Sequence, residues 1–216
     1  MNSDYSIRVG NRELVLHADA LLATQARSVL EKLKDILERS GTRAGVPTTV
    51  DFGWTRFIII ESGSKLVVHE PTFVGNVGDN VQGDVSRSLT IVARQVNVLR
   101  LLGVEGCDAS FKETLVYVPG HIADKKVYME RAHDKDPGDS GWYVGPVDGK
   151  PSPREMVSRY TSELLHVRPA LLDALLLPPG YLVVWDGDAI EAVVPDSGEN
   201  VWTSLMTQTR RTWPTP

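Results

Sequence analysis

Gly138–Asp139–Ser140–Gly141 is the segment of this sequence that comes closest to a catalytic motif, because the same four residue types surround the nucleophile of some serine proteases. Nucleophilic serine chemistry needs a base within hydrogen-bond reach and a third group that orients the base. None of the histidines lies in the sequence setting of such a base: His17, His69, His121, His133 and His166. We therefore predict that Asp139 and Ser140 cap backbone N–H groups in a tight loop. Hydrolysis by Ser140 is kept as an alternative hypothesis.

No other stretch of the chain matches a catalytic or metal-binding pattern. The sequence has no P-loop, no Gly-x-Ser-x-Gly and no Gly-x-Gly-x-x-Gly after a strand-like run. No histidine pair has the i, i+4 spacing of a helical zinc site. His133 lies near Asp134, Asp136 and Asp139, but the spacing differs from that of a calcium loop, which favours a solvated acidic loop. We therefore expect a protein without enzymatic activity, bound metal or cofactor.

Composition is typical of a soluble globular chain. Its 216 residues are 42% hydrophobic and 24% charged, which is enough to bury a core. The single cysteine, Cys107, excludes a disulfide within the chain and is expected to be inert beside Asp108. The N-terminal residues 1–14 lack the apolar segment of a signal peptide, and no apolar run reaches the length of a membrane span. We therefore expect a cytoplasmic protein that does not enter membranes.

Charge is unevenly distributed along the chain. The net charge is −5, and residues 109–216 carry 11 Lys/Arg against 15 Asp/Glu, whereas residues 1–108 carry 12 against 13. An acidic half does not suit a phosphate backbone, so we expect no nucleic-acid partner. It suits a basic protein partner, because opposite electrostatic fields steer association. Ordinary surface charge that keeps the chain soluble is the alternative explanation.

An aromatic pair, Trp142–Tyr143, directly follows the acidic residues. Neighbouring side chains of a strand point to opposite faces, so one of the two is expected inside and the other outside. An outward aromatic beside Asp134, Asp136 and Asp139 is typical of a protein-binding hot spot. These five residues are our candidate partner-binding residues, with core packing as the alternative for Trp142.

Hydrophobic periodicity predicts four helices. The first runs over Leu22–Leu37, between an N-cap at Asp19 and a C-terminal Gly41. A second is expected over about Val85–Leu102, with an apolar face formed by Leu89, Val92, Val96 and Leu99. Two more are expected over Arg154–His166 and Pro169–Leu177.

Alternating and β-branched runs predict the strands. They are expected at Tyr5–Val9, Glu13–Leu16, Thr48–Phe52, Arg56–Glu61, Lys65–His69, Leu115–Val118, Lys126–Arg131, Trp142–Val144, Tyr181–Trp185 and Ala189–Val194. Glu70–Gly83 is Gly- and Asn-rich and is expected to be a loop. Helices and strands do not alternate regularly, which favours an α+β fold with mixed or antiparallel sheets and a few packed helices. We expect two small domains, residues 1–108 and 109–206, and a mobile tail at residues 207–216.

The C-terminal half resembles the Imm33 family of immunity proteins. The resemblance lies in an ordered series of segments: Lys125–Arg131, then Asp136–Trp142 with its Asp-Ser-Gly-Trp motif, then Arg168–Leu172, and finally Leu175–Gly180. The family pattern has the same order: a strand, an acidic stretch, Asp-Ser-Gly-Trp, a variable loop, a helix, and a Pro-x-Leu segment before a final strand pair. The match covers residues 121–205.

The resemblance implies a bacterial immunity protein, which neutralises a toxin delivered between bacteria. Such a protein acts by binding and occluding the toxin, without catalysis, and its physics is that of a tight, selective interface. A cytoplasmic immunity protein implies a toxin that acts in the cytoplasm. Nucleases are common among such toxins and are basic, in agreement with the acidic half of this chain. A regulatory or structural protein-binding module with the same fold is the alternative.

Overall fold

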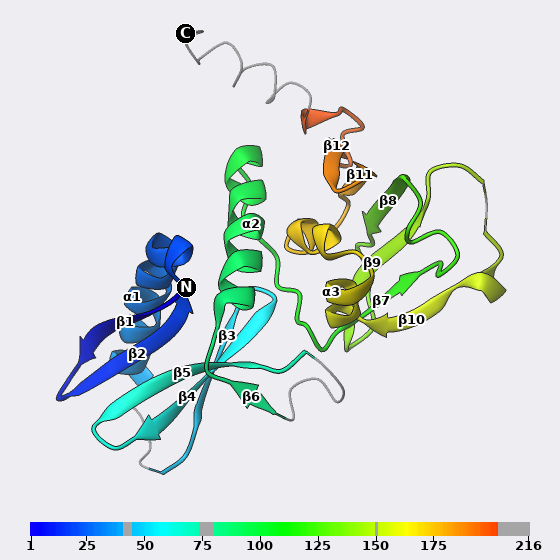
Figure 1. Cartoon of the computed structure of the whole chain (residues 1–216). Helices are drawn as coiled ribbons and strands as arrows, with labels where there is room; N and C mark the ends of the chain where they lie inside the picture. Colours follow the sequence, from blue (N-terminus) through cyan, green and yellow to red (C-terminus); the bar gives the residue numbers. More distant parts are fainter. Residues whose placement is uncertain (41–44, 74–79, 150, 203–216) are drawn as a thin grey trace, which may run out of the picture. The chain divides into compact units, whose positions relative to one another are not determined.

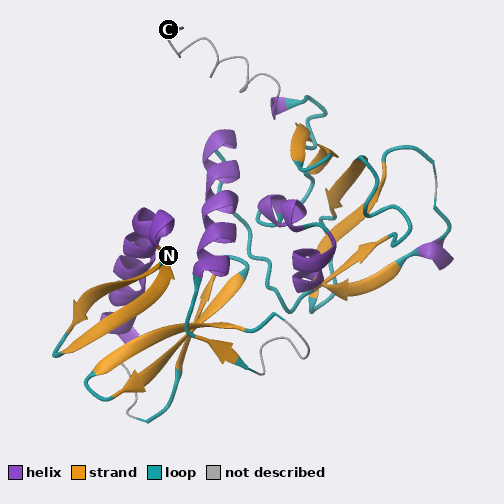
Figure 2. Ribbon diagram, in the orientation of Figure 1, coloured by secondary structure: helices purple, strands orange, loops and turns teal. Residues whose placement is uncertain are grey.

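The computed structural model describes residues 1–40, 45–73, 80–149 and 151–202, and it shows two compact units (Figures 1 and 2). Contacts divide the chain between Arg94 and Gln95, within helix α2 (Ser86–Leu102). Each unit has its own mixed sheet, so the predicted α+β fold with two small domains is confirmed. The predicted boundary after residue 108 stays a prediction, because compactness alone does not show where an independently folding domain begins.

The first unit is a mixed sheet with a long helix. Its elements are β1 (Asn2–Val9), β2 (Arg12–Asp19), the 3-10 helix η1 (Ala20–Leu22), α1 (Ala23–Ser40), β3 (Thr48–Phe52), β4 (Thr55–Ser62), β5 (Lys65–Pro71), β6 (Val81–Gln82) and the first residues of α2. The sheet order is β1-β2-β5-β4-β3, with β6 paired to β5. Only β2 and β5 run parallel among these pairs.

Sequence pattern and structure agree closely at the start of the chain. The predicted strands Tyr5–Val9 and Glu13–Leu16 form the β1–β2 hairpin, which turns at Gly10–Asn11, where Gly10 has a φ of 58°. Asp19 is the predicted N-cap, and its carboxylate accepts the Leu21 N–H at the start of η1. The apolar stripe of α1 is buried against β1 and β2, through Ala26, Val29, Leu30, Leu33 and Leu37. Gly41, the predicted end of this helix, lies outside the described residues.

The second unit is built on a six-stranded mixed sheet covered by short helices. Its elements after α2 are β7 (Thr114–Tyr117), β8 (Lys126–Arg131), β9 (Asp139–Pro146), η2 (Pro153–Glu155), β10 (Val157–Tyr160), η3 (Thr161–Glu163), α3 (Leu164–Val167), η4 (Pro169–Ala174), β11 (Leu182–Asp186) and β12 (Ala189–Val194). The strand order is β10-β7-β9-β8-β11-β12. β7 and β9 are parallel and the other neighbours antiparallel.

The helix predicted over Arg154–His166 is wrong. This segment contains η2, the edge strand β10 and η3, and only α3 is α-helical. β10 pairs with β7 from Val157↔Tyr117 to Tyr160↔Thr114, so the open edge of β7 overrides the local helical periodicity. The helix predicted over Pro169–Leu177 is a 3-10 helix, η4, and Pro169 begins it as expected.

Two further details depart from the pattern. Val96, expected on the apolar face of α2, is 50% exposed, whereas Gln95 is fully buried and donates its amide N–H to Leu172 O at 2.9 Å. The buried side of α2 therefore includes a polar residue, Gln95, whose amide is hydrogen-bonded to a backbone carbonyl. The expected loop at Glu70–Gly83 contains the short strand β6.

Within the described residues, no helix is long and apolar enough to cross a membrane. The predicted mobile tail at residues 207–216 lies outside the described part of the chain.

Candidate functional site

The second sheet has one buried face and one outer face. Along β8, Val127 and Met129 are fully buried, whereas Lys126 and Glu130 are exposed and Tyr128 is half-buried. Short helices cover the buried face, as Figure 1 shows for α3. Directly paired residues share a face of the sheet. The pairs Val116↔Tyr143, Tyr143↔Glu130 and Tyr128↔Val184 therefore lie on the face opposite to the buried one. We call these five residues, Val116, Tyr128, Glu130, Tyr143 and Val184, the outer face.

The Asp-Ser-Gly-Trp segment is a structural turn at the start of β9. Asp139 Oδ1 accepts the Gly141 N–H at 2.6 Å, as predicted for a capping aspartate. Ser140 is fully buried; its hydroxyl donates to Thr114 O at 2.8 Å and accepts the Trp142 N–H at 3.3 Å. A buried hydroxyl that donates to a carbonyl is not poised as a nucleophile, since the geometry needs a base as acceptor. The structure therefore gives no support to hydrolysis by Ser140.

Arg131 locks this turn to the rest of the unit. Its side chain is 2% exposed and donates to five backbone carbonyls, those of Cys107, Asp108, Ser140, Leu175 and Leu177. Its guanidinium also lies 5.8 Å from the centre of the Trp142 ring. Burial lowers the pKa of Arg131, against the opposing effects of Cys107, Glu113 and Asp108. Carbonyl oxygens thus replace the water that this buried charge has lost.

The structure separates Trp142 from the other candidate partner-binding residues. Trp142 is 1% exposed and donates its indole N–H to Leu175 O at 2.9 Å. It supports the sheet from inside and offers no surface in the free protein. Tyr143 lies half-buried on the outer face, so the two neighbours alternate as strand geometry requires.

The three candidate aspartates lie in and after the loop between β8 and β9. Asp134 and Asp136 are exposed, while Asp139 is half-buried and held by Gly141 N and by Thr114 Oγ1 at 3.4 Å. The loop is fixed by Lys135 Nζ, which lies 2.9 Å from Glu113 Oε1, and by hydrogen bonds between its backbone and β9. Among the described residues, no cation pairs with Asp134 or Asp136. Two unpaired negative charges are therefore presented by an anchored loop.

Two lysines beside the outer face, Lys125 and Lys126, are paired with carboxylates of this chain. Lys126 Nζ lies 2.7 and 2.8 Å from the two carboxylate oxygens of Glu191, and these contacts raise the pKa of Lys126. Lys125 lies 3.3 Å from Asp186. Glu130 is exposed beside Tyr143 and, within the described part of the chain, has no ion-pair partner. The outer face and the loop together form an acidic and aromatic surface.

Tyr128 and Glu130, which lie on the outer face, were not among the predicted site residues. Alternation within Lys126–Arg131 is enough to place Tyr128 and Glu130 on one face. Their pairing with Tyr143 depends on the β8–β9 register, which the intervening loop does not reveal.

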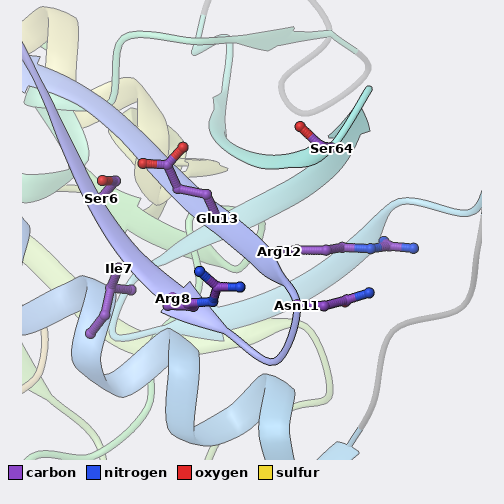
Figure 3. A pocket seen from close by; sticks show the side chains of 7 residues that line it. All are labelled: Ser6, Ile7, Arg8, Asn11, Arg12, Glu13 and Ser64. Carbon is purple, nitrogen blue, oxygen red and sulfur yellow. The ribbon is translucent and has the colours of Figure 1, made fainter.

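A hollow lies in the first unit, next to the turn of the β1–β2 hairpin (Figure 3). Its lining is mainly polar: Ser6, Ile7, Arg8, Asn11, Arg12, Glu13 and Ser64. Its carboxylate and guanidinium groups are engaged, because Arg12 pairs with Glu61, and Glu13 lies 3.4 Å from Lys65. A hydrogen bond from Ser6 and the charge of Lys65 lower the pKa of Glu13. Nothing in this lining selects a ligand.

Metal binding finds no support in the geometry. Within the described residues, no three His, Cys, Asp or Glu side chains gather where they could hold a metal ion. His133, within the loop between β8 and β9, instead places Nε2 2.8 Å from Asp196 Oδ2.

Residues 94–196 match the model of the Imm33-like domain. The match includes all six strands of the second sheet, from Thr114 to Val194. Comparison with curated proteins finds no match, and comparison with solved structures finds none. The resemblance of the C-terminal half to the Imm33 family is therefore confirmed.

Proposed function

We propose, from the premise that residues 94–196 form an Imm33-like domain, that this protein is a bacterial immunity protein. It binds a cognate polymorphic toxin that acts in the cytoplasm and neutralises it by occlusion, without catalysis. The observation that carries the proposal is the extent of the family match, which spans the whole second sheet together with the loop between β8 and β9.

The geometry of the second unit supports a binding role. Internal hydrogen bonds hold the Asp-Ser-Gly-Trp turn, and the guanidinium of Arg131 donates its hydrogen bonds to backbone carbonyls. These residues make a rigid support for the loop that presents Asp134 and Asp136 and for the strand that presents Tyr143. A preformed surface lowers the entropy cost of binding, which a high-affinity inhibitor requires.

Charge supports a basic partner. Asp134, Asp136 and Glu130 are exposed on neighbouring segments, while Lys125, Lys126 and Lys135 are each paired with a carboxylate of this chain. The field around this surface is therefore negative. Such a field repels nucleic acid and accelerates encounter with a basic protein.

The test is a toxicity-rescue assay. A candidate toxin encoded beside this protein is expressed in a bacterial cytoplasm with and without it, and the association rate of the purified pair is measured. We expect rescue by the wild type. We expect Asp134→Lys and Asp136→Lys each to slow association by about 3- to 10-fold, because both remove steering charge. Asp139 is a poorer choice, since its carboxylate caps Gly141.

The matched control is Glu31→Lys, an exposed position on α1 that receives the same change of charge in the first unit. It should associate at the wild-type rate. Equal slowing by all three substitutions would show that only net charge matters and would remove the proposed surface. Failure to rescue, with an active toxin and a folded protein, would favour a regulatory protein-binding module with this fold.

A further inference from the structure

Two tyrosines and a glutamate converge on the outer face of the second sheet. The rings of Tyr128 and Tyr143 have centroids 5.6 Å apart and planes inclined at 55°. Tyr128 is paired with Gly145, and Tyr143 with Glu130, so the two rings are diagonal neighbours across β8 and β9. The register thus places the Glu130 carboxylate next to an aromatic pair.

Gly145 determines where the Tyr143 ring lies. A Cβ at residue 145 would come within 2.7 Å of Tyr143 Cε1 and Cζ, a distance that real contacts essentially never show. The phenol end of Tyr143 therefore rests directly on the backbone at Gly145, next to Tyr128. Because Gly145 has no positive φ, its lack of a side chain serves this close approach and not the backbone conformation.

The electrostatics of this spot are negative. Burial first, then Tyr143 and the Glu130 carboxylate, raise the pKa of Tyr128. The nearest cations on β8 are engaged elsewhere: Lys126 pairs with Glu191, and Arg131 points to the buried side, where it donates to carbonyls. Among the described residues, Glu130 has no ion-pair partner. Aromatic faces beside an unpaired carboxylate are the setting that attracts an organic cation.

We propose that Tyr128, Tyr143 and Glu130 form the seat for an arginine side chain of the protein partner. A planar guanidinium stacks on aromatic rings and pairs with a carboxylate, and it loses hydration more readily than an ammonium group does. A phosphate-bearing ligand would be repelled by Glu130 and by the nearby Asp134 and Asp136. The inference rests on the proposed function in that the partner is the toxin.

The test uses the full chain and a probe that needs no toxin. Acetyl-arginine amide is titrated into protein labelled at its tyrosine rings, and ring resonances are followed by NMR at constant ionic strength. Acetyl-citrulline amide, which has nearly the same shape without the charge, is the control ligand. We expect shifts of Tyr128 and Tyr143 that saturate at about 10–100 mM with the arginine probe, and none that saturate with citrulline.

Three variants sharpen the result. Glu130→Gln, at an exposed position, should weaken the arginine response by about 2- to 5-fold. Gly145→Ala should abolish it by displacing the Tyr143 ring, although all three seat residues are still present. Asp188→Asn, an exposed carboxylate in the β11–β12 turn, should leave it unchanged.

Equal responses to arginine and citrulline would overturn the seat, as would an arginine response that survives Gly145→Ala. Failure of the probe together with successful rescue would mean that the toxin binds by other residues and that the immunity role stands. A probe response without rescue would leave the seat intact and remove the toxin as its partner.

Discussion

At the scale of single residues, two buried arginines have backbone carbonyls in place of carboxylate partners. Arg168 is 6% exposed and donates to Ile122 O, Asp124 O, Lys125 O and Gly187 O, as Arg131 does to its own five carbonyls. Each guanidinium spans segments that are distant in sequence. Its five N–H donors in a fixed plane explain why a lysine could not replace it.

Gly141 offers a residue-scale prediction, with Gly138 as its matched control. Both have positive φ, 78° and 87°, which costs a non-glycine residue about 1–2 kcal/mol. A Cβ at Gly138 would meet nothing within 4 Å, whereas at Gly141 it would lie 3.3 Å from Ala132 O. We therefore expect Gly138→Ala to lower the free energy of unfolding by about 1 kcal/mol, and Gly141→Ala by about 1 kcal/mol more. Urea unfolding followed by tryptophan fluorescence measures both in the same unit.

Equal losses for the two glycine variants would show that the loop moves aside without cost, contrary to the anchoring by Lys135 and Glu113. A loss of stability in Gly138→Ala but not in Gly141→Ala would contradict the prediction, because it would show that the contact between residue 141 and Ala132 O costs nothing.

Sequence reasoning reached part of the candidate site at this scale. Alternation correctly required Trp142 and Tyr143 to face opposite ways, and capping chemistry indicated the role of Asp139. The sequence did not predict that Arg131 binds backbone carbonyls, because its acceptors belong to residues up to 46 positions away. Contacts of this kind are set by packing, and no local pattern records them.

At the scale of elements, two carboxylates hold the start of α2. Asp84 Oδ1 accepts the Ser86 N–H at 2.9 Å, and Glu70 Oε2 accepts the Ser88 N–H at 2.8 Å. Burial raises the pKa of Glu70, although hydrogen bonds from Ser88 and Gln82 oppose it. For Asp84 burial also acts to raise the pKa and is the largest single effect, but the combined bonds from Ser86 and Asn2 lower the pKa. One helix end thus holds two acids with opposite shifts.

These opposite shifts predict opposite pH dependences. The pKa of Glu70 is raised above its ordinary value of 4.5, so its contribution to stability is full below that value and is lost as pH rises through the folded-state pKa. The free energy of unfolding of the wild type should therefore fall, relative to Glu70→Gln, as pH rises from 4.5 toward neutrality. Urea unfolding of both proteins at a series of pH values measures the difference.

Asp84→Asn is the control of opposite sign. Because the pKa of Asp84 is lowered from 3.8, its contribution is present above that value and is lost as pH falls through the folded-state pKa. Relative to this variant, the wild type should lose stability on acidification. If the free energy of unfolding of the wild type changed with pH in parallel with that of both variants, the pKa shifts given to Glu70 and Asp84 would both be contradicted.

Elements that depend on interactions between residues close in sequence could be predicted, and elements that depend on distant pairing could not. The β1–β2, β4–β5 and β11–β12 hairpins could be predicted because turn residues and alternation lie within a few positions of each other. β10 could not, because it is a strand only through its pairing with β7, some forty residues earlier. The same holds for the mixed character of each sheet, which rests on one parallel pair.

At the scale of the whole molecule, the two units meet in sequence inside α2. Residues 95–108 contribute to the second unit: Gln95 bonds Leu172 O, Val98 is 5% exposed, and Cys107 N donates to Leu176 O at 2.9 Å. The Imm33-like match also begins at residue 94. These contacts bear directly on the predicted boundary after residue 108.

A pair of fragments tests the boundary. We expect a fragment that begins at residue 94 to unfold cooperatively, and one that begins at residue 109 to melt at least about 10 °C lower or not to fold. The shorter fragment lacks Val98 and two of the carbonyls that Arg131 needs. Thermal unfolding monitored by near-UV circular dichroism decides between them. Equal melting temperatures would support the domain boundary at residues 108–109.

Arg131 also has a consequence for how the chain is made. Its five acceptors lie on both sides of it, from Cys107 to Leu177, so the last of them is synthesised 46 residues after the arginine itself. A nascent chain that stops before Leu175 lacks two of these five acceptors, the carbonyls of Leu175 and Leu177, so its guanidinium is only partly satisfied by protein groups. We therefore expect the second unit to close only after Leu177 has been synthesised, and chains truncated before it to be more open to proteolysis.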